Sequence, residues 1–151
     1  MLYHLYYTKG LESSDIVKQL GITYAVLLKS IDKLMDANMI KRNSGLWCVK
    51  DINSFFAVNK IESVEAKLNQ WNSALKQALH NTRFSSESYV LSELKTEPAQ
   101  HTVDKFNDFG IGMYLKNPSG FNKVSKSKHS NIPNSYTSLW IGELIGRTIN
   151  C

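Results

Sequence analysis

The chain lacks a long apolar segment, because no hydrophobic run approaches the roughly 18 residues that a membrane-spanning helix needs. Its first residues, MLYHLYYTKG, lack the basic and then apolar pattern of a signal peptide. Hydrophobic residues make up 42% of the 151 residues and charged residues 21%, a composition that excludes a disordered chain. We therefore expect a soluble, cytoplasmic protein that has no membrane partner and forms one ordinary domain or two very small ones.

Cysteine is scarce. Cys48 and Cys151 lie far apart, and neither has a partner at the spacing of a metal or redox site. Cys48 lies in an apolar stretch, which favours a small core residue over a reactive thiol. The four histidines show no ligand spacing either, so a zinc site is not expected.

Acidic residues are absent between Asp108 and Glu143, and the net charge of +5 is uneven along the chain. Residues 1–50 contain seven Lys and Arg against four Asp and Glu, residues 51–112 six against eight, and residues 113–151 five against one. Basic ends around an acidic middle are typical of a protein that binds a polyanion.

Residues 1–50 show three helical patterns followed by a hairpin pattern. The first helical pattern ends at Gly10, the second ends at Gly21, and the third covers 23–38. Two short apolar runs within 40–50 then flank an Asn-Ser-Gly turn sequence, which indicates a β-hairpin.

This order resembles the winged helix-turn-helix domain of many small regulators. The matching parts are the turn Leu20-Gly21-Ile22-Thr23, the long helix that follows it, and a wing from Ile40 to Lys50. The resemblance implies that the long helix lies in a major groove and that the wing lies near phosphates. With the lysines of the basic end of the chain as phosphate contacts, the predicted DNA-binding residues are Thr23, Tyr24, Lys29, Lys33, Lys41, Arg42, Lys123, Lys126 and Lys128.

Two apolar residues depart from this pattern. Base edges are normally read by polar side chains, but Val26 and Leu28 lie early on the long helix. They favour packing against the rest of this chain or against another protein. A pure protein-interaction module is therefore a further interpretation of the first part of the chain.

Residues 51–151 alternate strand-like and helical patterns, which predicts an α/β domain and an α+β chain overall. The first two patterns are strand-like and are expected to form a hairpin. A helix, a strand, a helix, a strand, a polar loop and a closing helix follow. The predicted strands and helices, in chain order and leaving out the polar loop, cover residues 51–58, 60–68, 70–84, 88–92, 97–110, 111–116 and 135–149.

The second strand-like run carries a carboxylate and an amine in its middle. Residues i and i+2 of a strand share a face, so Glu65 and Lys67 should project together while Val64 and Ala66 face the core. The expected hairpin would return Asp51 to the neighbourhood of Glu65. Two carboxylates supply the oxygen ligands that Mg²⁺ or Mn²⁺ prefers. A neighbouring lysine can hold or deprotonate an attacking water molecule.

This arrangement resembles the PD-(D/E)XK nuclease superfamily, which has the restriction-endonuclease-like fold. The resemblance implies that Asp51, Glu65 and the backbone carbonyl of Ala66 hold the metal. It also implies that Lys67 is the catalytic lysine and that Gln77, on the following helix, belongs to the catalytic site. The function that it implies is a Mg²⁺-dependent DNA endonuclease to which the winged helix delivers duplex DNA.

Three alternatives to the catalytic interpretation stay open, and the first is a nuclease-like fold whose site is inactive or has altered chemistry. Glu65 and Lys67 can form a solvent-facing pair on an edge strand, where charges discourage aggregation. The chain can also be a non-catalytic regulator or antitoxin-like protein that binds an operator through its first part. The α/β part would then form a homodimer or capture a partner.

Overall fold

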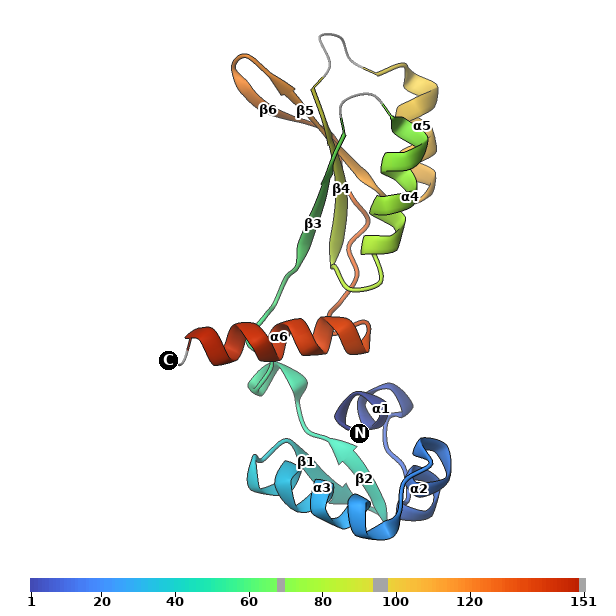
Figure 1. The fold of residues 1–151 in the computed structure, drawn as a ribbon, viewed down its shortest axis with the longest axis vertical. Helices are drawn as coiled ribbons and strands as arrows, with labels where there is room; N and C mark the ends of the chain where they lie inside the picture. The colour runs from blue at the N-terminus through green and yellow to red at the C-terminus, as the bar shows by residue number, and fades with distance from the viewer. Residues whose placement is uncertain (68–69, 94–97, 150–151) are drawn as a thin grey trace. The chain divides into compact units, whose positions relative to one another are not determined.

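The computed structural model describes residues 1–67, 70–93 and 98–149 (Figure 1). Leu68 and Glu97, the predicted end of a strand and start of a helix, lie outside these ranges. The chain divides into two compact units, Met1–Ala57 and Val58–Cys151, so the boundary lies seven residues after the predicted one. Helices and strands occur together, as an α+β chain requires.

The first unit has the order of helices and hairpin that its sequence predicts. Leu11 additionally forms an antiparallel bridge with Trp47, which ties the segment between the first two helices to the hairpin. The elements are α1 (Leu2–Thr8), α2 (Ser13–Leu20), α3 (Tyr24–Asp36), β1 (Ile40–Asn43), β2 (Leu46–Val49) and the 3₁₀ turn η1 (Ile52–Ser54).

Local sequence signals set the turn between α2 and α3. Gly21 ends α2 with φ of 62°, a left-handed conformation in which glycine has no Cβ to clash. The Thr23 hydroxyl then caps α3 by accepting a hydrogen bond from the backbone N–H of Val26, at 3.3 Å. One apolar face of each helix packs into a core formed by Leu5, Ile16, Leu27, Ile31 and Ile40.

The second unit is a four-stranded sheet with helices against one face. Its strands lie in the order β3-β4-β5-β6, in which β3, β4 and β5 are parallel and β6 is antiparallel to β5. The elements are β3 (Glu62–Ala66), α4 (Trp71–Asn81), β4 (Glu87–Ser92), α5 (Gln100–Asp108), β5 (Gly112–Asn117), β6 (Gly120–Ser125) and α6 (Tyr136–Ile149).

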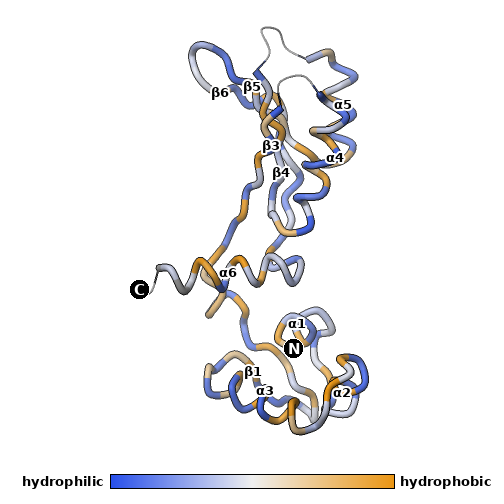
Figure 2. Tube along the Cα trace, viewed as in Figure 1, coloured by the Kyte–Doolittle hydropathy of each residue, from blue (hydrophilic) through white to orange (hydrophobic). Residues whose placement is uncertain are grey.

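Helices α4 and α5 cover the same face of this sheet (Figure 1). Trp71 of α4 and Phe106 of α5 meet edge to face, with ring centroids 5.8 Å apart. Hydrophobic and hydrophilic residues alternate along α4, as expected for a helix with one buried face (Figure 2). The core under the two helices consists of Ala74, Leu75, Ala78, Val90, Val103, Phe106, Ile111 and Met113.

The predicted hairpin of 51–58 with 60–68 is wrong. Asp51 caps η1, because its carboxylate accepts hydrogen bonds from the backbone N–H and the side-chain amide of Asn53, both at 3.1 Å. This local bonding competes with a strand ladder. β3 instead pairs in parallel with β4, and α4 makes the crossover that a parallel connection needs.

The polar loop predicted after residue 116 contains a strand. The sequence Asn117-Pro118-Ser119-Gly120 turns the chain so that β6 returns beside β5, and the Asn117 side chain accepts a hydrogen bond from the backbone N–H of Ser119. Proline and glycine in one short turn are the signal that could have indicated it. None of the helices in the described part of the chain is both long and apolar enough to cross a bilayer.

Candidate functional site

The first unit exposes all six of its predicted DNA-binding residues. Two lysines of α3 lie one helical turn apart, and two cations of β1 are neighbours in the hairpin. The Thr23 hydroxyl oxygen caps α3 by accepting a hydrogen bond, which leaves its O–H group able to donate to a ligand. The exposed residues are Thr23, Tyr24, Lys29, Lys33, Lys41 and Arg42.

Arg42 is held in place by its neighbour in the hairpin. Its guanidinium lies over the ring of Trp47, with the carbon 5.4 Å from the ring centroid. The indole N–H of Trp47 donates to the hydroxyl of Ser13 at 3.0 Å, which fixes the ring. A cation stacked on a fixed aromatic ring loses less freedom when it binds a phosphate.

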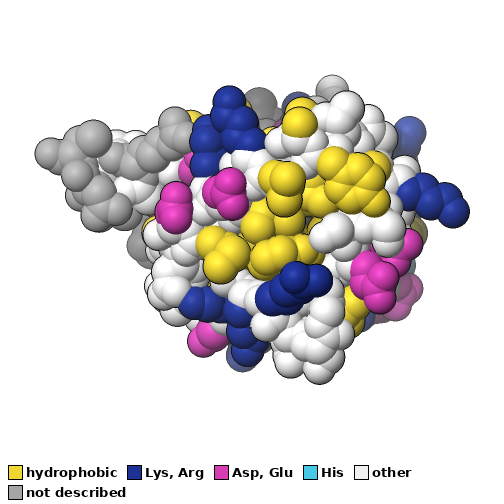
Figure 3. Space-filling view, turned by 90° about the horizontal axis from the view of Figure 1, so that it is seen from below, with side chains coloured by type: hydrophobic (Ala, Val, Ile, Leu, Met, Phe, Trp, Pro, Cys, Tyr) yellow, Lys and Arg dark blue, Asp and Glu magenta, His cyan; other side chains and the backbone are white. Residues whose placement is uncertain are grey.

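The exposed face of α3 is chemically mixed. Tyr24, Leu28 and Met35 are each at least half exposed, and the first two are one helical turn apart. Asp32 and Asp36 are exposed on the same helix. Figure 3 shows hydrophobic side chains gathered on this unit, with lysine or arginine and acidic side chains around them. Leu28 and Met35 can contact thymine methyl groups but cannot pair with polar base edges, whereas the Tyr24 hydroxyl can form a hydrogen bond. Electrostatic attraction to DNA would depend on the cations.

Glu65 and Lys67 project together, as predicted, and form an ion pair with 3.5 Å between Nζ and Oε1. The predicted orientation of their strand is wrong. Glu65 is in register with Val90, a residue of the core under α4 and α5, while Val64 is 51% exposed. Ser63 is the buried residue of this strand, and its hydroxyl bonds to that of Ser85 at 3.1 Å.

The predicted metal-binding set is not assembled on a hairpin. Asp51 belongs to the first unit and caps its own turn, whereas Glu65 and Ala66 lie on β3 of the second unit. Gln77 is exposed on α4 and is not among the residues of that helix that face the sheet. Among the residues that the structure describes, no three or more His, Cys, Asp or Glu side chains gather as a metal site.

A cleft of about 260 Å³ lies at the carboxyl ends of β3, β4 and β5. Lys116 forms an ion pair with Glu93 at 3.2 Å across this edge. The carboxyl edge is where open sheets of parallel strands usually bind ligands. Sequence reasoning missed both residues, although charged residues at the end of a buried strand could have indicated them. The cleft is lined by Ala66, Lys67, Leu91, Glu93 and Lys116.

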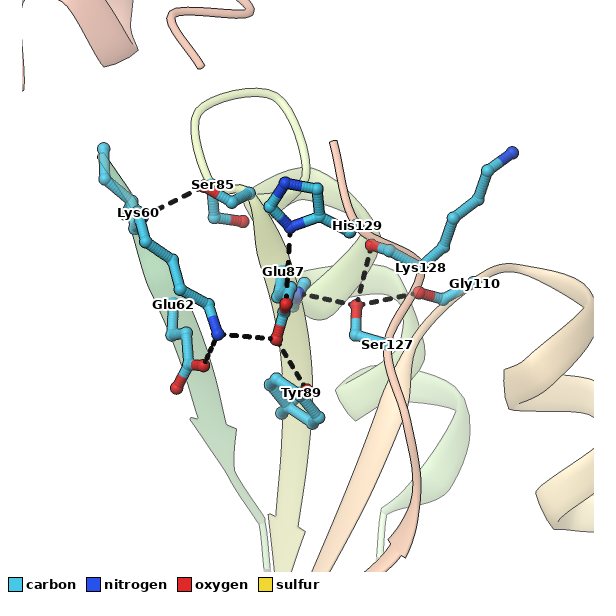
Figure 4. A network of polar contacts seen from close by, with 12 residues as sticks. Lys60, Glu62, Ser85, Glu87, Tyr89, Gly110, Ser127, Lys128 and His129 are labelled. Atoms are coloured by element: carbon cyan, nitrogen blue, oxygen red, sulfur yellow. Dashed lines mark hydrogen bonds and ion pairs between the residues drawn. The ribbon is translucent and has the colours of Figure 1, made fainter. Parts of the chain in front are cut away.

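A polar network lies at the amino end of the same sheet (Figure 4). The Glu87 carboxylate accepts a hydrogen bond from the Tyr89 hydroxyl at 2.7 Å and pairs with Lys60 at 3.1 Å and His129 at 3.4 Å. The hydrogen bond from Tyr89, together with Lys60 and His129, lowers the pKa of Glu87 to about 2 despite its burial. The network joins β4 to the segments on either side of it, and this role is structural.

The basic residues near the end of the chain differ in their surroundings. Lys123 lies on β6, with its ammonium 4.9 Å from the ring centroid of Tyr89 and 5.0 Å from that of Tyr114. A hydrogen bond with Tyr114 raises the pKa of Lys123. Lys126 and Lys128 follow β6 and are exposed. Lys123 is exposed as well, so all three lysines are accessible to a ligand.

No protein-family model, curated protein or solved structure matches this chain. The geometry of the two units is therefore the basis for the function proposed below.

Proposed function

We propose that the protein binds double-stranded DNA through its first unit. The observation that supports this is the helix–turn–helix order followed by a short hairpin, with exposed cations on both α3 and β1. In such an arrangement the second helix of the pair enters a major groove and the hairpin lies along the phosphates.

Phosphate contacts would supply most of the affinity. Lys29 and Lys33 lie one turn apart on α3, while Lys41 and Arg42 extend the cationic surface to β1. Each cation that neutralises a phosphate releases condensed counterions, so affinity falls as salt rises. The acids and apolar residues on α3 add little to this attraction, which favours modest sequence specificity.

Anisotropy of a labelled duplex, titrated with the full chain at several salt concentrations, tests the proposal. Four phosphate contacts predict a slope of about −3.6 for log K against log salt. Lys33→Ala should reduce the slope by about 1, whereas Lys76→Ala, an exposed lysine on α4, should leave it unchanged. Absence of duplex binding at low salt, or equal effects of the two variants, would contradict it.

A second candidate function is Mg²⁺-dependent hydrolysis of a phosphodiester. The observation that favours it is that the Glu65–Lys67 pair lies beside the cleft at the carboxyl ends of the parallel strands. Glu93 lines the cleft, and Glu65 pairs with Lys67, which also lines it. These carboxylates would be the ones available to Mg²⁺, an ion that commonly takes one or two protein carboxylates and completes its shell with water and substrate phosphates. When bound, the ion would supply charge stabilisation, and Lys67 would hold or deprotonate the attacking water.

Incubation of plasmid with the full chain and Mg²⁺ or Mn²⁺ should then give nicked product. Glu65→Ala and Lys67→Ala should each reduce nicking by at least about 100-fold, because each removes a group at the reacting centre. Lys76→Ala serves as the control and should nick like the unchanged protein. Failure to cleave supercoiled, linear and single-stranded DNA would exclude this function while leaving duplex binding intact.

A further inference from the structure

A groove of about 550 Å³ lies between the end of α5 and the segment that follows β6. It belongs to the second unit and shares no residue with the cleft at the carboxyl ends of the strands. Seven residues line it, and they include an aromatic ring, two lysines and one acid. They are Asn107, Asp108, Phe109, Gly110, Lys126, Ser127 and Lys128.

Hydrogen bonds fix the two walls of this groove against each other (Figure 4). The Ser127 hydroxyl donates to the carbonyl of Gly110 at 3.0 Å and accepts from the backbone N–H of Ser88 at 3.0 Å. The backbone N–H of Lys128 donates to the same carbonyl at 2.9 Å. The groove is therefore formed before any ligand arrives.

Glycine is needed where the walls meet. Gly110 has φ of 71°, and a Cβ at this position would lie 2.9 Å from the Cβ of Lys128. A larger residue would be strained and would push the two walls apart. The close approach keeps Lys128 beside the end of α5, next to Phe109.

The lining combines a stacking surface with positive charge. Phe109 follows the last residue of α5 and is 52% exposed, so its ring is accessible to a ligand in the groove that it lines. Lys126 and Lys128 are exposed on the opposite wall, and Asp108 is the one acid among the lining residues. An exposed aromatic ring next to cations is the chemistry with which proteins bind unpaired bases and their phosphates.

From this chemistry we infer that the groove binds a single strand of nucleic acid. One unpaired base stacks on Phe109, and the flanking phosphates contact Lys126 and Lys128. The bases of a duplex are stacked on each other and cannot reach such a ring, so the groove selects unpaired strands. This activity goes beyond duplex binding, because it uses different residues in the other unit.

The test is anisotropy of labelled oligo-dT and oligo-rU of about ten nucleotides with the full chain. Phe109→Ala should weaken binding about tenfold, and Phe109→Tyr should retain it, because stacking needs only an aromatic face. Phe121→Ala is the matched control, since Phe121 is 66% exposed on β6 but does not line the groove. Tighter binding of one oligonucleotide identifies the natural strand as DNA or RNA.

Charge variants distinguish single-strand binding in the groove from duplex binding by the first unit. Lys126→Ala with Lys128→Ala should weaken single-strand binding and reduce its salt slope by about 1.4, while Asp108→Asn should strengthen it several-fold. Lys29→Ala should weaken duplex binding only. The inference is overturned if no single strand binds at low salt, or if Phe109→Ala has no effect. It is also overturned if Phe121→Ala weakens binding as much as Phe109→Ala in variants that fold normally.

Discussion

Reversing the charges of Lys29 and Arg42 together should weaken duplex binding by at least about 100-fold at low salt. At about 50 mM salt, the counterions released by one phosphate contact contribute roughly tenfold to affinity. Two lost contacts therefore account for about 100-fold, and the two new carboxylates add repulsion. Lys29→Glu with Arg42→Glu thus tests both halves of the proposed interface, the helix α3 and the strand β1.

Neither substitution should unfold the first unit. Lys29 and Arg42 are exposed, and the core of the unit consists of other residues. The stacking of Arg42 on Trp47 is an exposed contact, whose loss costs at most about 1 kcal/mol. Thermal unfolding and duplex anisotropy, measured on the same samples, separate a binding defect from a folding defect.

A control variant with two other charges reversed shows whether the loss of duplex affinity depends on the position of the charges or on the net charge of the chain. Lys76→Glu with Arg83→Glu changes the net charge of the chain by the same amount, and both residues are exposed on the second unit. This control should keep most of the duplex affinity. If this control weakens duplex binding as much as Lys29→Glu with Arg42→Glu, the duplex is attracted by the net charge of the whole chain. The first unit is then not the interface.

The first unit could be predicted well because its signals are local. Gly21 ends one helix, Thr23 caps the next, and Gly45 with φ of 86° makes the hairpin turn. Each residue acts through neighbours within a few positions, so the sequence alone contains the cause. The bridge between Leu11 and Trp47 was not predictable in this way, because the two residues that it joins are far apart in the chain.

Non-local pairing explains why the second unit was predicted less well. The run 51–58 looks like a strand by composition, but the local cap made by Asp51 prevents a ladder there. The side of β3 that faces the core depends on its register with β4, and a shift of one residue reverses every side chain. The alternation in β3 indicated that Glu65 and Lys67 share a face, but not that this face lies towards the helices.

The candidate sites of the second unit also depend on topology. Lys67, Glu93 and Lys116 come from three separate parts of the sequence and meet because β3, β4 and β5 end at one edge. Phe109 and Lys128 meet because the chain returns beside α5 after β6. The spacing of residues in the sequence does not predict that these side chains lie close together, because their proximity depends on the order of the strands in the sheet.

The second unit should lose stability in acid through Glu87. Its pKa lies at about 2 in the folded protein against an ordinary value of 4.5, so protons bind the unfolded chain more readily. The stabilisation is complete above about pH 5 and is lost as the pH falls towards 2. Each pKa unit corresponds to about 1.4 kcal/mol, so the difference between 4.5 and about 2 sets an upper limit of about 3.5 kcal/mol on this stabilisation.

Glu87→Gln removes this titration and keeps the shape of the side chain. The variant should be less stable than the unchanged protein at about pH 6, and it should lose less stability between about pH 5 and pH 3. Hydrogen exchange of the β4 backbone amides, followed as a function of pH, measures the stability of the second unit alone. Glu62→Gln is the control, since Glu62 pairs with the same Lys60 but is 41% exposed, so screening makes its contribution small. If Glu87→Gln loses stability in acid as steeply as the unchanged protein, Glu87 does not hold the amino end of the sheet together through its charge.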